Sequence, residues 1–308
     1  MSSAKPIVSN GPERKYARGF SLGLTAYFIW GSFPLIIVAL GFASAAEIVA
    51  WRVIFGFLTA VVIIAFTKSW SQLREVFRNR TNVLWVATSA LFIFINWMVY
   101  VIAVANHQTE EAALGYFINP LLTIVLAVIF LGERLSKLQW VAVGLGVIAG
   151  VVLTVDYGHL PYIALSLATS FGIYGLAKNK LGGKVDAAHS FAIESGFVVP
   201  IAAGILAFVA SGSGLHFMAA GPSGALGLAA YGALTAIPLI LFGAAAKHLP
   251  LRFIGFMQYL TPSIQFIIAL TVFHEPMPPV RWIGFGLVWI GLAVLIFDAL
   301  TVKRRSVI

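Results

Sequence analysis

The sequence contains no cysteine, and only 11 of its 308 residues are aspartate or glutamate. The first absence excludes disulfide bonds, thiolate metal sites and cysteine nucleophiles. Charged residues make up 10% of the chain and hydrophobic residues 60%, whereas an ordinary soluble domain is ~25% charged. This composition indicates that lipid, rather than water, is the main solvent of the protein.

Sequence motifs for common enzyme chemistry are also missing. There is no Walker loop, serine nucleophile elbow or metalloprotease helix motif, which excludes ATP hydrolysis and the common hydrolase reactions. Four histidines lie beside acidic residues, but their spacing matches no ligand motif, so we predict no metal site and no cofactor. They are His107, His159, His216 and His274.

Ten long apolar stretches are present instead, separated by short polar breaks. Each has about the 20 residues that a membrane-spanning helix needs. The stretches are continuous rather than alternating, which argues against a β-barrel. The predicted spans are 18 to 40, 45 to 67, 82 to 105, 109 to 131, 136 to 155, 160 to 180, 187 to 210, 222 to 246, 251 to 273 and 279 to 300.

The basic residues lie on one side of these ten spans. Of 20 lysines and arginines, only Arg281 falls on the other face and only Arg52 falls well inside a span. The formal charge of +9 therefore indicates orientation rather than nucleic-acid binding. By the positive-inside rule, both termini are predicted to be cytoplasmic.

The chain resembles itself at a shift of 142 residues. Because each unit holds five spans, an odd number, the second unit must cross the membrane in the opposite sense to the first. The alternative to an internal duplication is chance, because Gly, Pro and Trp are common at the ends of membrane helices. The matched pair Asp156 and Asp298, each at the end of a unit, argues against chance. The matched pairs are Pro120 and Pro262, Glu133 and Glu275, Trp140 and Trp282, Gly144 and Gly286, and Asp156 and Asp298.

The predicted organisation is an all-α membrane protein with ten transmembrane helices in two inverted five-helix repeats. The repeats cover residues 18–156 and 157–300, and the cytoplasmic tails cover residues 1–17 and 301–308.

Arg52 is the sharpest functional signal, because a charge inside a span costs roughly 2.5 to 3.5 kcal/mol on insertion scales. Its counterpart in the second repeat is Glu194, so one duplicated position carries opposite charges. We expect Arg52 to bind an anionic substrate group or to gate the pathway, and Glu194 to be a proton or cation site. A charge network that only fixes helix packing is the alternative. Glu47 could neutralise Arg52 or act as a helix cap.

Polar and aromatic side chains cluster in the middle of two neighbouring spans. Spacings of three and four residues place them on shared helix faces, so they could line one cavity, although amides also hold membrane helices together. The candidates are Asn96, Trp97, Tyr100, Tyr116 and Asn119.

Prolines inside spans remove a backbone hydrogen bond, and breaks at matching places in both repeats point to a binding site. The predicted helix breaks are at Pro120, Pro238 and Pro262. Further candidates for substrate contact on the ninth span are Gln258, Tyr259 and Gln265.

Several segments resemble the RarD branch of the EamA-type drug/metabolite transporters, over nearly the whole chain. The resemblance implies ten helices, cytoplasmic termini, no ATPase and a link to chloramphenicol sensitivity or resistance. The segments are AYFIWGSFPL at 26–35, Glu47 with Arg52, INWMVYVIAV at 95–104, ALGYFINPLLTIVLAVIFLGERL at 113–135, SFGIYGLAKNK at 170–180, LTAIPLILF at 234–242 and GFMQYLTPSIQF at 255–266.

The predicted function is a secondary permease of the cytoplasmic (inner) membrane that exports a small polar or amphiphilic solute by alternating access. Its expected partners are the small-molecule substrate and the lipid bilayer, with no nucleic acid, and the sequence leaves a homodimer open. The alternatives are a membrane enzyme acting on a lipid-borne substrate and a signalling or scaffold protein. The latter would not require an inverted duplication.

Overall fold

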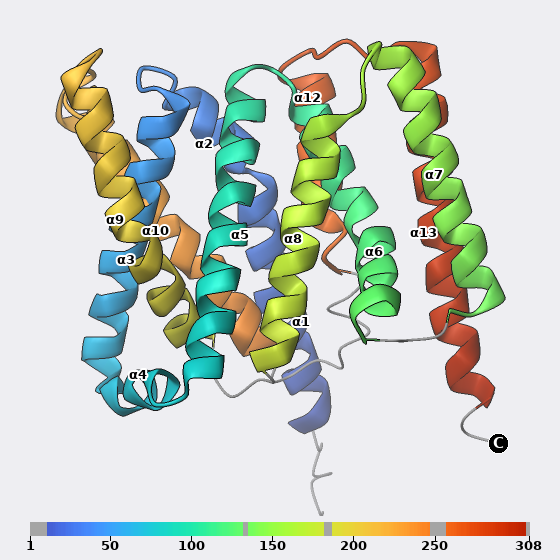
Figure 1. Cartoon of the computed structure of the whole chain (residues 1–308), viewed down its shortest axis with the longest axis horizontal. Helices are drawn as coiled ribbons and strands as arrows, with labels where there is room; N and C mark the ends of the chain where they lie inside the picture. Colours follow the sequence, from blue (N-terminus) through green and yellow to red (C-terminus); the bar gives the residue numbers. More distant parts are fainter. Residues whose placement is uncertain (1–10, 132–134, 182–186, 247–256, 306–308) are drawn as a thin grey trace, which may run out of the picture.

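The computed structural model describes residues 11–131, 135–181, 187–246 and 257–305, and all regular structure in these ranges is helical (Figure 1). The helices are α1 (Gly11–Gly31), α2 (Phe33–Ala39), α3 (Ala45–Thr67), α4 (Trp70–Phe77), α5 (Arg80–Ala105), α6 (Thr109–Leu131), α7 (Lys137–Tyr157), α8 (Tyr162–Leu181), α9 (Ala187–Ser211), α10 (Gly221–Ala246), α12 (Leu260–Thr271) and α13 (Pro279–Arg305).

Seven helical segments in the described ranges are long and apolar enough to cross a membrane. They lie in α1 with α2, α3, α5, α6, α7, α9 and α13. Large apolar side chains point outward from them, and Phe66 and Phe208 are 85% and 80% exposed. Such a surface suits lipid, because water would have to solvate it at a large free-energy cost. The predicted spans at 160 to 180 and 222 to 246 coincide with α8 and α10.

The predicted span at 18 to 40 is confirmed as a candidate membrane span, Ala17–Ala39, but it is interrupted at Ser32, because α1 ends at Gly31 and α2 begins at Phe33. Proline at the start of α2 explains the interruption. Pro34 has no N–H to donate to the carbonyl of Trp30, four residues earlier. The side-chain amide of Gln265 donates to this carbonyl instead, at 3.3 Å.

Local sequence signals explain where other helices begin. Ser44 precedes α3 in an extended conformation, and its hydroxyl accepts a hydrogen bond from the backbone N–H of Glu47. Ser136 and Gln139 form a reciprocal capping box at the start of α7. Both arrangements satisfy N–H groups that a helix leaves without partners in its first turn. The short helix α4 was not predicted; it lies in the basic connection between α3 and α5.

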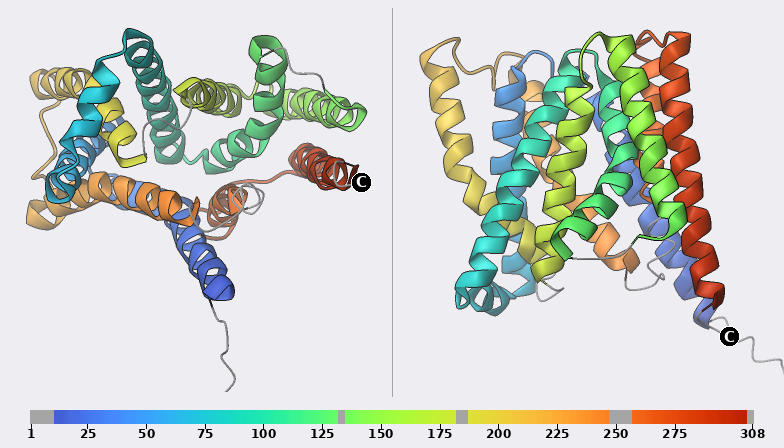
Figure 2. Two further views of the ribbon diagram at one scale, coloured as in Figure 1. Left: turned by 90° about the horizontal axis from the view of Figure 1, so that it is seen from below. Right: turned by 45° about the vertical axis from the view of Figure 1, so that its right-hand side comes forward.

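The helices form a bundle in which α1 begins and α13 ends on the same side as α4 (Figure 1). Viewed along the bundle, α5, α8, α6 and α7 form one row and α10, α1, α12 and α13 another, with α3 and α9 at one end (Figure 2). The largest buried cluster contains Phe33 of α2, Val53 of α3, Trp97 of α5, Phe191 of α9 and Tyr231 of α10. The polar site described next lies within this cluster.

Candidate functional site in the membrane core

Arg52 lies on α3 in the interior of the bundle and is only 4% exposed. Its Nε donates to the hydroxyl of Thr235 and its Nη1 to the hydroxyl of Tyr231, each at 3.1 Å. The guanidinium carbon lies 4.5 Å from the ring centroid of Trp97 and 5.1 Å from that of Tyr231. The ring of Phe33 is 5.4 Å away. Aromatic rings and neutral hydroxyl groups therefore surround the charge.

Small residues bring α3 and α10 close together at this point. A Cβ added to Gly232 would lie 3.0 Å from the carbonyl oxygen of Arg52 and 3.0 Å from the backbone nitrogen of Gly56. Only glycine fits such a close approach of two backbones. Since Tyr231 and Thr235 are four residues apart on α10, both side chains then face Arg52.

Glu47 does not neutralise Arg52. Its carboxylate accepts hydrogen bonds from the backbone N–H of His216, at 2.9 Å, and lies 3.2 Å from the imidazole Nδ1 of the same residue. It also accepts the indole N–H of Trp51 at 3.3 Å. The interpretation of Glu47 as the counter-ion of Arg52 is therefore wrong. In the described part of the chain, no carboxylate is within ion-pair distance of Arg52.

Asn96 of α5 forms hydrogen bonds with residues of α6 and α8. The contact with α6 agrees with the prediction that polar side chains of these two neighbouring spans lie close together. Its amide nitrogen donates to the carbonyl of Leu167 at 3.0 Å and to the hydroxyl of Ser170 at 3.1 Å. Its amide oxygen accepts the hydroxyl of Tyr116 at 3.0 Å. The rings of Tyr100 and Tyr116 lie 5.8 Å apart. Both N–H donors of the Asn96 amide and one of the two acceptor sites on its oxygen are therefore used in contacts within the protein.

Two buried polar atoms near these tyrosines have no partner among the described residues: the hydroxyl of Tyr100 and the amide oxygen of Gln265. Tyr100 interacts electrostatically with Arg52, Tyr116 and Tyr231, and the side chains of Tyr100 and Gln265, from α12, lie within hydrogen-bonding reach of each other. Buried polar atoms in proteins nearly always have a hydrogen-bond partner. Their position beside Arg52 makes this the strongest candidate site for a ligand.

The remaining predicted contact residues are further from this centre. Asn119 is half-buried, and its amide oxygen accepts a long hydrogen bond of 3.5 Å from Thr123. Gln258 is exposed, and Tyr259 packs against the cluster around Phe117. The structure shows no contact of these three with Arg52.

The predicted helix breaks differ from one another. Pro120 and Pro238 lie inside α6 and α10, which continue through them, so the prediction of an interruption is wrong there. Pro262 is the third residue of α12. Proline is well tolerated in the first turn of a helix, whose N–H groups have no partner within the helix. The described chain does break near the site, between α1 and α2.

Glu194 forms a second polar cluster, between α9, α8 and α5. Its Oε1 accepts hydrogen bonds from Ser89 at 2.8 Å and from Ser190 at 3.0 Å. The ammonium of Lys178 is also 2.8 Å away and contacts Ser190. Glu194 and Arg52 are therefore not paired with each other.

The two clusters are related by the 142-residue shift. Glu194 follows Arg52 by 142 residues, and Tyr231 follows Ser89 by the same number. Each charged side chain is thus bound to a hydroxyl at the equivalent place in the other unit. The shift leads to Tyr231 only once the contact between Ser89 and Glu194 is known from the structure. Thr235, Phe33 and Lys178 were missed because no local motif marks them.

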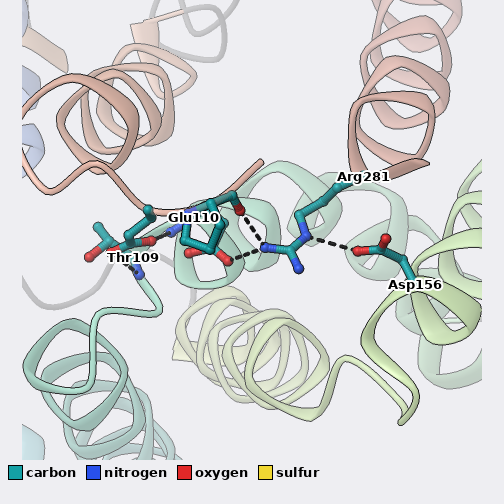
Figure 3. A network of polar contacts seen from close by, with 6 residues as sticks. Thr109, Glu110, Asp156 and Arg281 are labelled. Carbon is teal, nitrogen blue, oxygen red and sulfur yellow. Dashed lines mark hydrogen bonds and ion pairs between the residues drawn. The ribbon is translucent and has the colours of Figure 1, made fainter. Parts of the chain in front are cut away.

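A third network joins α6, α7 and α13 (Figure 3). It lies at the bundle end opposite α4 (Figure 1). The guanidinium of Arg281 donates to Asp156 at 3.0 Å, to Glu110 at 2.9 Å and to the carbonyl of Pro276 at 2.8 Å. Glu275 accepts the backbone N–H groups of Thr109 and Glu110 at 2.9 and 2.8 Å. Burial by itself raises the pKa of Glu275, but hydrogen bonding with the side chain of Glu110, together with the hydrogen bonds from the backbone and side chain of Thr109 and from the backbone of Glu110, outweighs burial and holds the pKa below its ordinary value.

Comparisons with known proteins agree with this architecture. Residues 17–155 match the model of the EamA-like transporter family. Protein RarD of Streptomyces exfoliatus is 42% identical, with 96% of this chain and 93% of that protein aligned. Protein RarD of Escherichia coli strain K12 is 39% identical, over 94% and 97% of the two chains. The chain belongs to the RarD branch of the EamA-type drug/metabolite transporters.

A solved crystal structure supports the fold of this RarD-type chain. It superposes with a TM-score of 0.57 at 20% sequence identity, covering 93% of this chain and 99% of the other. Together with the apolar helices, the family places the protein in the inner membrane as a multi-pass transporter.

Proposed function

We propose that the protein is a secondary permease that exports a small polar or amphiphilic solute by alternating access, with Arg52 at the substrate site. The observation that carries the proposal is a buried arginine with no carboxylate partner among the described residues. A charge in the membrane interior is stabilised either by a partner in the protein or by a ligand. The chloramphenicol phenotype implied by the resemblance is part of the proposal.

Helix contacts support two inverted repeats, of which α1 with α2 and α8 are the first members. The pairs α3 with α9, α6 with α12 and α7 with α13 each join equivalent helices. The pair α5 with α8 is equivalent to α10 with α1, and the pair α6 with α8 to α12 with α1. Two such halves around a central site can exchange their arrangements, which alternates access from one side of the membrane to the other.

Reconstituted transport tests the proposal. Purified protein in proteoliposomes should move at least one solute, from a labelled panel of metabolites that includes chloramphenicol, faster than empty vesicles do. Arg52→Gln should lower the initial rate roughly 100-fold, because truncating a buried charge that binds a partner costs several kcal/mol. Arg80→Gln, at an exposed position at the start of α5, is the matched control and should leave the rate unchanged.

Two results would count against the permease. One is the absence of flux above empty vesicles across the whole panel. The other is conversion of a labelled lipid by the purified protein, abolished by Glu194→Gln, which would favour a membrane enzyme. Gel filtration of each variant in detergent separates loss of transport from loss of the folded protein.

A further inference from the structure

The short helix α4 lies across the end of the bundle rather than along it (Figure 2). It connects two candidate membrane spans, Ala45–Thr67 of α3 and Arg80–Ala105 of α5. Its Val76 is buried and packs in a cluster with Val86 of α5 and Ile193 of α9. This packing holds α4 at the level where the two spans meet the membrane surface.

A second apolar face of α4 points away from the bundle. Trp70 and Phe77 are 48% and 56% exposed. They are seven residues apart, about two helical turns, and Leu73 lies between them on the same face. The ring of Phe77 lies 6.4 Å from that of Phe197, which is itself exposed on the candidate span of α9. This second face therefore continues into the lipid-facing surface of α9.

A hollow of ≈ 630 Å³ opens on this second face and is lined by Trp70, Leu73, Phe77 and Arg78. Three of these side chains are apolar and the fourth is a cation. Arg78 is exposed and forms no ion pair with another described residue. A ligand that satisfies the whole hollow must therefore combine an apolar body with an anionic group.

The charge of the surrounding segment also favours an anion. Residues 68–80 contain four basic side chains and one acidic side chain, Glu75, a formal net charge of +3. The charge pattern predicts this side to be cytoplasmic, where anionic lipids attract basic segments next to spanning helices. Tryptophan and arginine suit the boundary between headgroups and acyl chains, because each combines an apolar part with a polar one.

We propose that this hollow binds an anionic phospholipid, with the lipid phosphate at Arg78 and an acyl chain along Trp70, Leu73 and Phe77. A soluble anion would use the charge but leave the apolar wall in water, and an uncharged lipid would do the reverse. The lipid site is separate from the Arg52 site, and it does not require that the protein transports a solute.

Native mass spectrometry of the purified full-length protein in detergent tests the inference with three probes. Dioleoylphosphatidylglycerol carries a net charge, dioleoylphosphatidylcholine has the same acyl chains without it, and glycerol phosphate has the charge without the chains. The first should bind about 10-fold more tightly than the second, because charge-assisted hydrogen bonds are the stronger ones. Glycerol phosphate should not bind measurably, since it buries no apolar surface.

Three variants at exposed positions assign these preferences to residues. Arg78→Gln should weaken phosphatidylglycerol binding about 10-fold and remove the preference over phosphatidylcholine. Arg80→Gln removes the same charge outside the hollow and should change the affinity about 2-fold at most, since exposed charges are screened. Trp70→Ala should weaken both lipids by the same factor. Equal melting temperatures without added lipid would show that all three variants are folded.

An equal loss of affinity in Arg78→Gln and Arg80→Gln would indicate diffuse attraction to a basic surface and would overturn the inference. Equal binding of the two lipids to the wild-type protein would overturn it as well. Binding of glycerol phosphate as tight as that of phosphatidylglycerol would identify free phosphate esters as the ligand instead. None of these measurements involves solute flux, so they decide the lipid site independently of the permease.

Discussion

The charges at positions 52 and 194 have very different partners, although the internal duplication makes the two positions equivalent. Arg52 has only hydroxyl groups and aromatic rings around it in the described chain. Glu194 has a cation, Lys178, and two serine hydroxyl groups. Glu194 is thus already compensated in the absence of ligand, while Arg52 is not. This difference separates a candidate substrate site from a candidate proton site.

Replacing Lys178 with methionine should destabilise the protein more than replacing both Lys178 and Glu194. The single change leaves a carboxylate that is 3% exposed without its cation, and breaking a buried pair costs about 3 kcal/mol or more. The Lys178→Met/Glu194→Gln double variant removes the charge as well. Thermal unfolding in detergent measures the stability of the single and the double variant. Additive losses in the double-mutant cycle would show that the two groups are not coupled.

The role of Glu194 in coupling is tested separately by transport. If it is a proton site, Glu194→Gln should remove the dependence of solute flux on an imposed pH gradient while downhill flux continues. Unchanged pH dependence in this variant would assign the cluster to helix packing alone.

Residue partners were the least predictable part of the site. Arg52, Asn96, Trp97, Tyr100 and Tyr116 could be selected because polar and aromatic groups in an apolar span stand out. The partner of Glu47, in contrast, is His216, 169 residues away. Such a pairing depends on the rotation of each helix and on the path of the loops, and the local spacing of residues in the sequence predicts neither.

At the scale of helices, hydropathy predicted the boundaries well, because ~20 apolar residues in a row admit few alternatives to a spanning helix. Prolines were harder to interpret. Pro34 begins a new helix, whereas α6 and α10 continue through Pro120 and Pro238. The outcome depends on whether another group satisfies the freed carbonyl, as Gln265 does for Trp30.

Glu275 should act as a helix cap whose contribution depends on pH. Its carboxylate accepts the first two N–H groups of α6, and hydrogen bonds hold its pKa below the ordinary value. A group with a lowered folded-state pKa stabilises the protein above its unfolded pKa, about 4.3, and this contribution is lost as pH falls through the folded-state value. Glu275→Gln should therefore cost ~1 kcal/mol at neutral pH and progressively less in acid.

Melting temperatures in detergent at pH 7 and at lower pH values check this prediction. Ser136→Ala removes a neutral cap at the start of α7 and serves as the control, since its cost should not change with pH. A gap between wild type and Glu275→Gln that stays constant or widens in acid would contradict the assignment.

At the scale of the whole molecule, the equivalent helix contacts and the shared 142-residue shift support the proposal that the second unit is the first turned over in the membrane. The proposal predicts that equivalent residues of the two units face opposite sides. Thr81 and Ser223 are 142 residues apart, at the starts of α5 and α10, and both are exposed. Arg18 lies at the start of the candidate span Ala17–Ala39 and Tyr162 at the start of α8; they are 144 residues apart and form a second exposed pair.

The absence of cysteine makes this arrangement directly measurable, because single cysteines can be introduced without background. A membrane-impermeant maleimide applied to intact cells should label Ser223→Cys and Tyr162→Cys. It should label Thr81→Cys and Arg18→Cys only after the inner membrane is permeabilised, since basic connections remain in the cytoplasm. Val49→Cys, at a fully buried position, should stay unlabelled in both. Labelling of both members of either pair from the same side would rule out the inverted arrangement, and with it the exchange of halves on which alternating access depends.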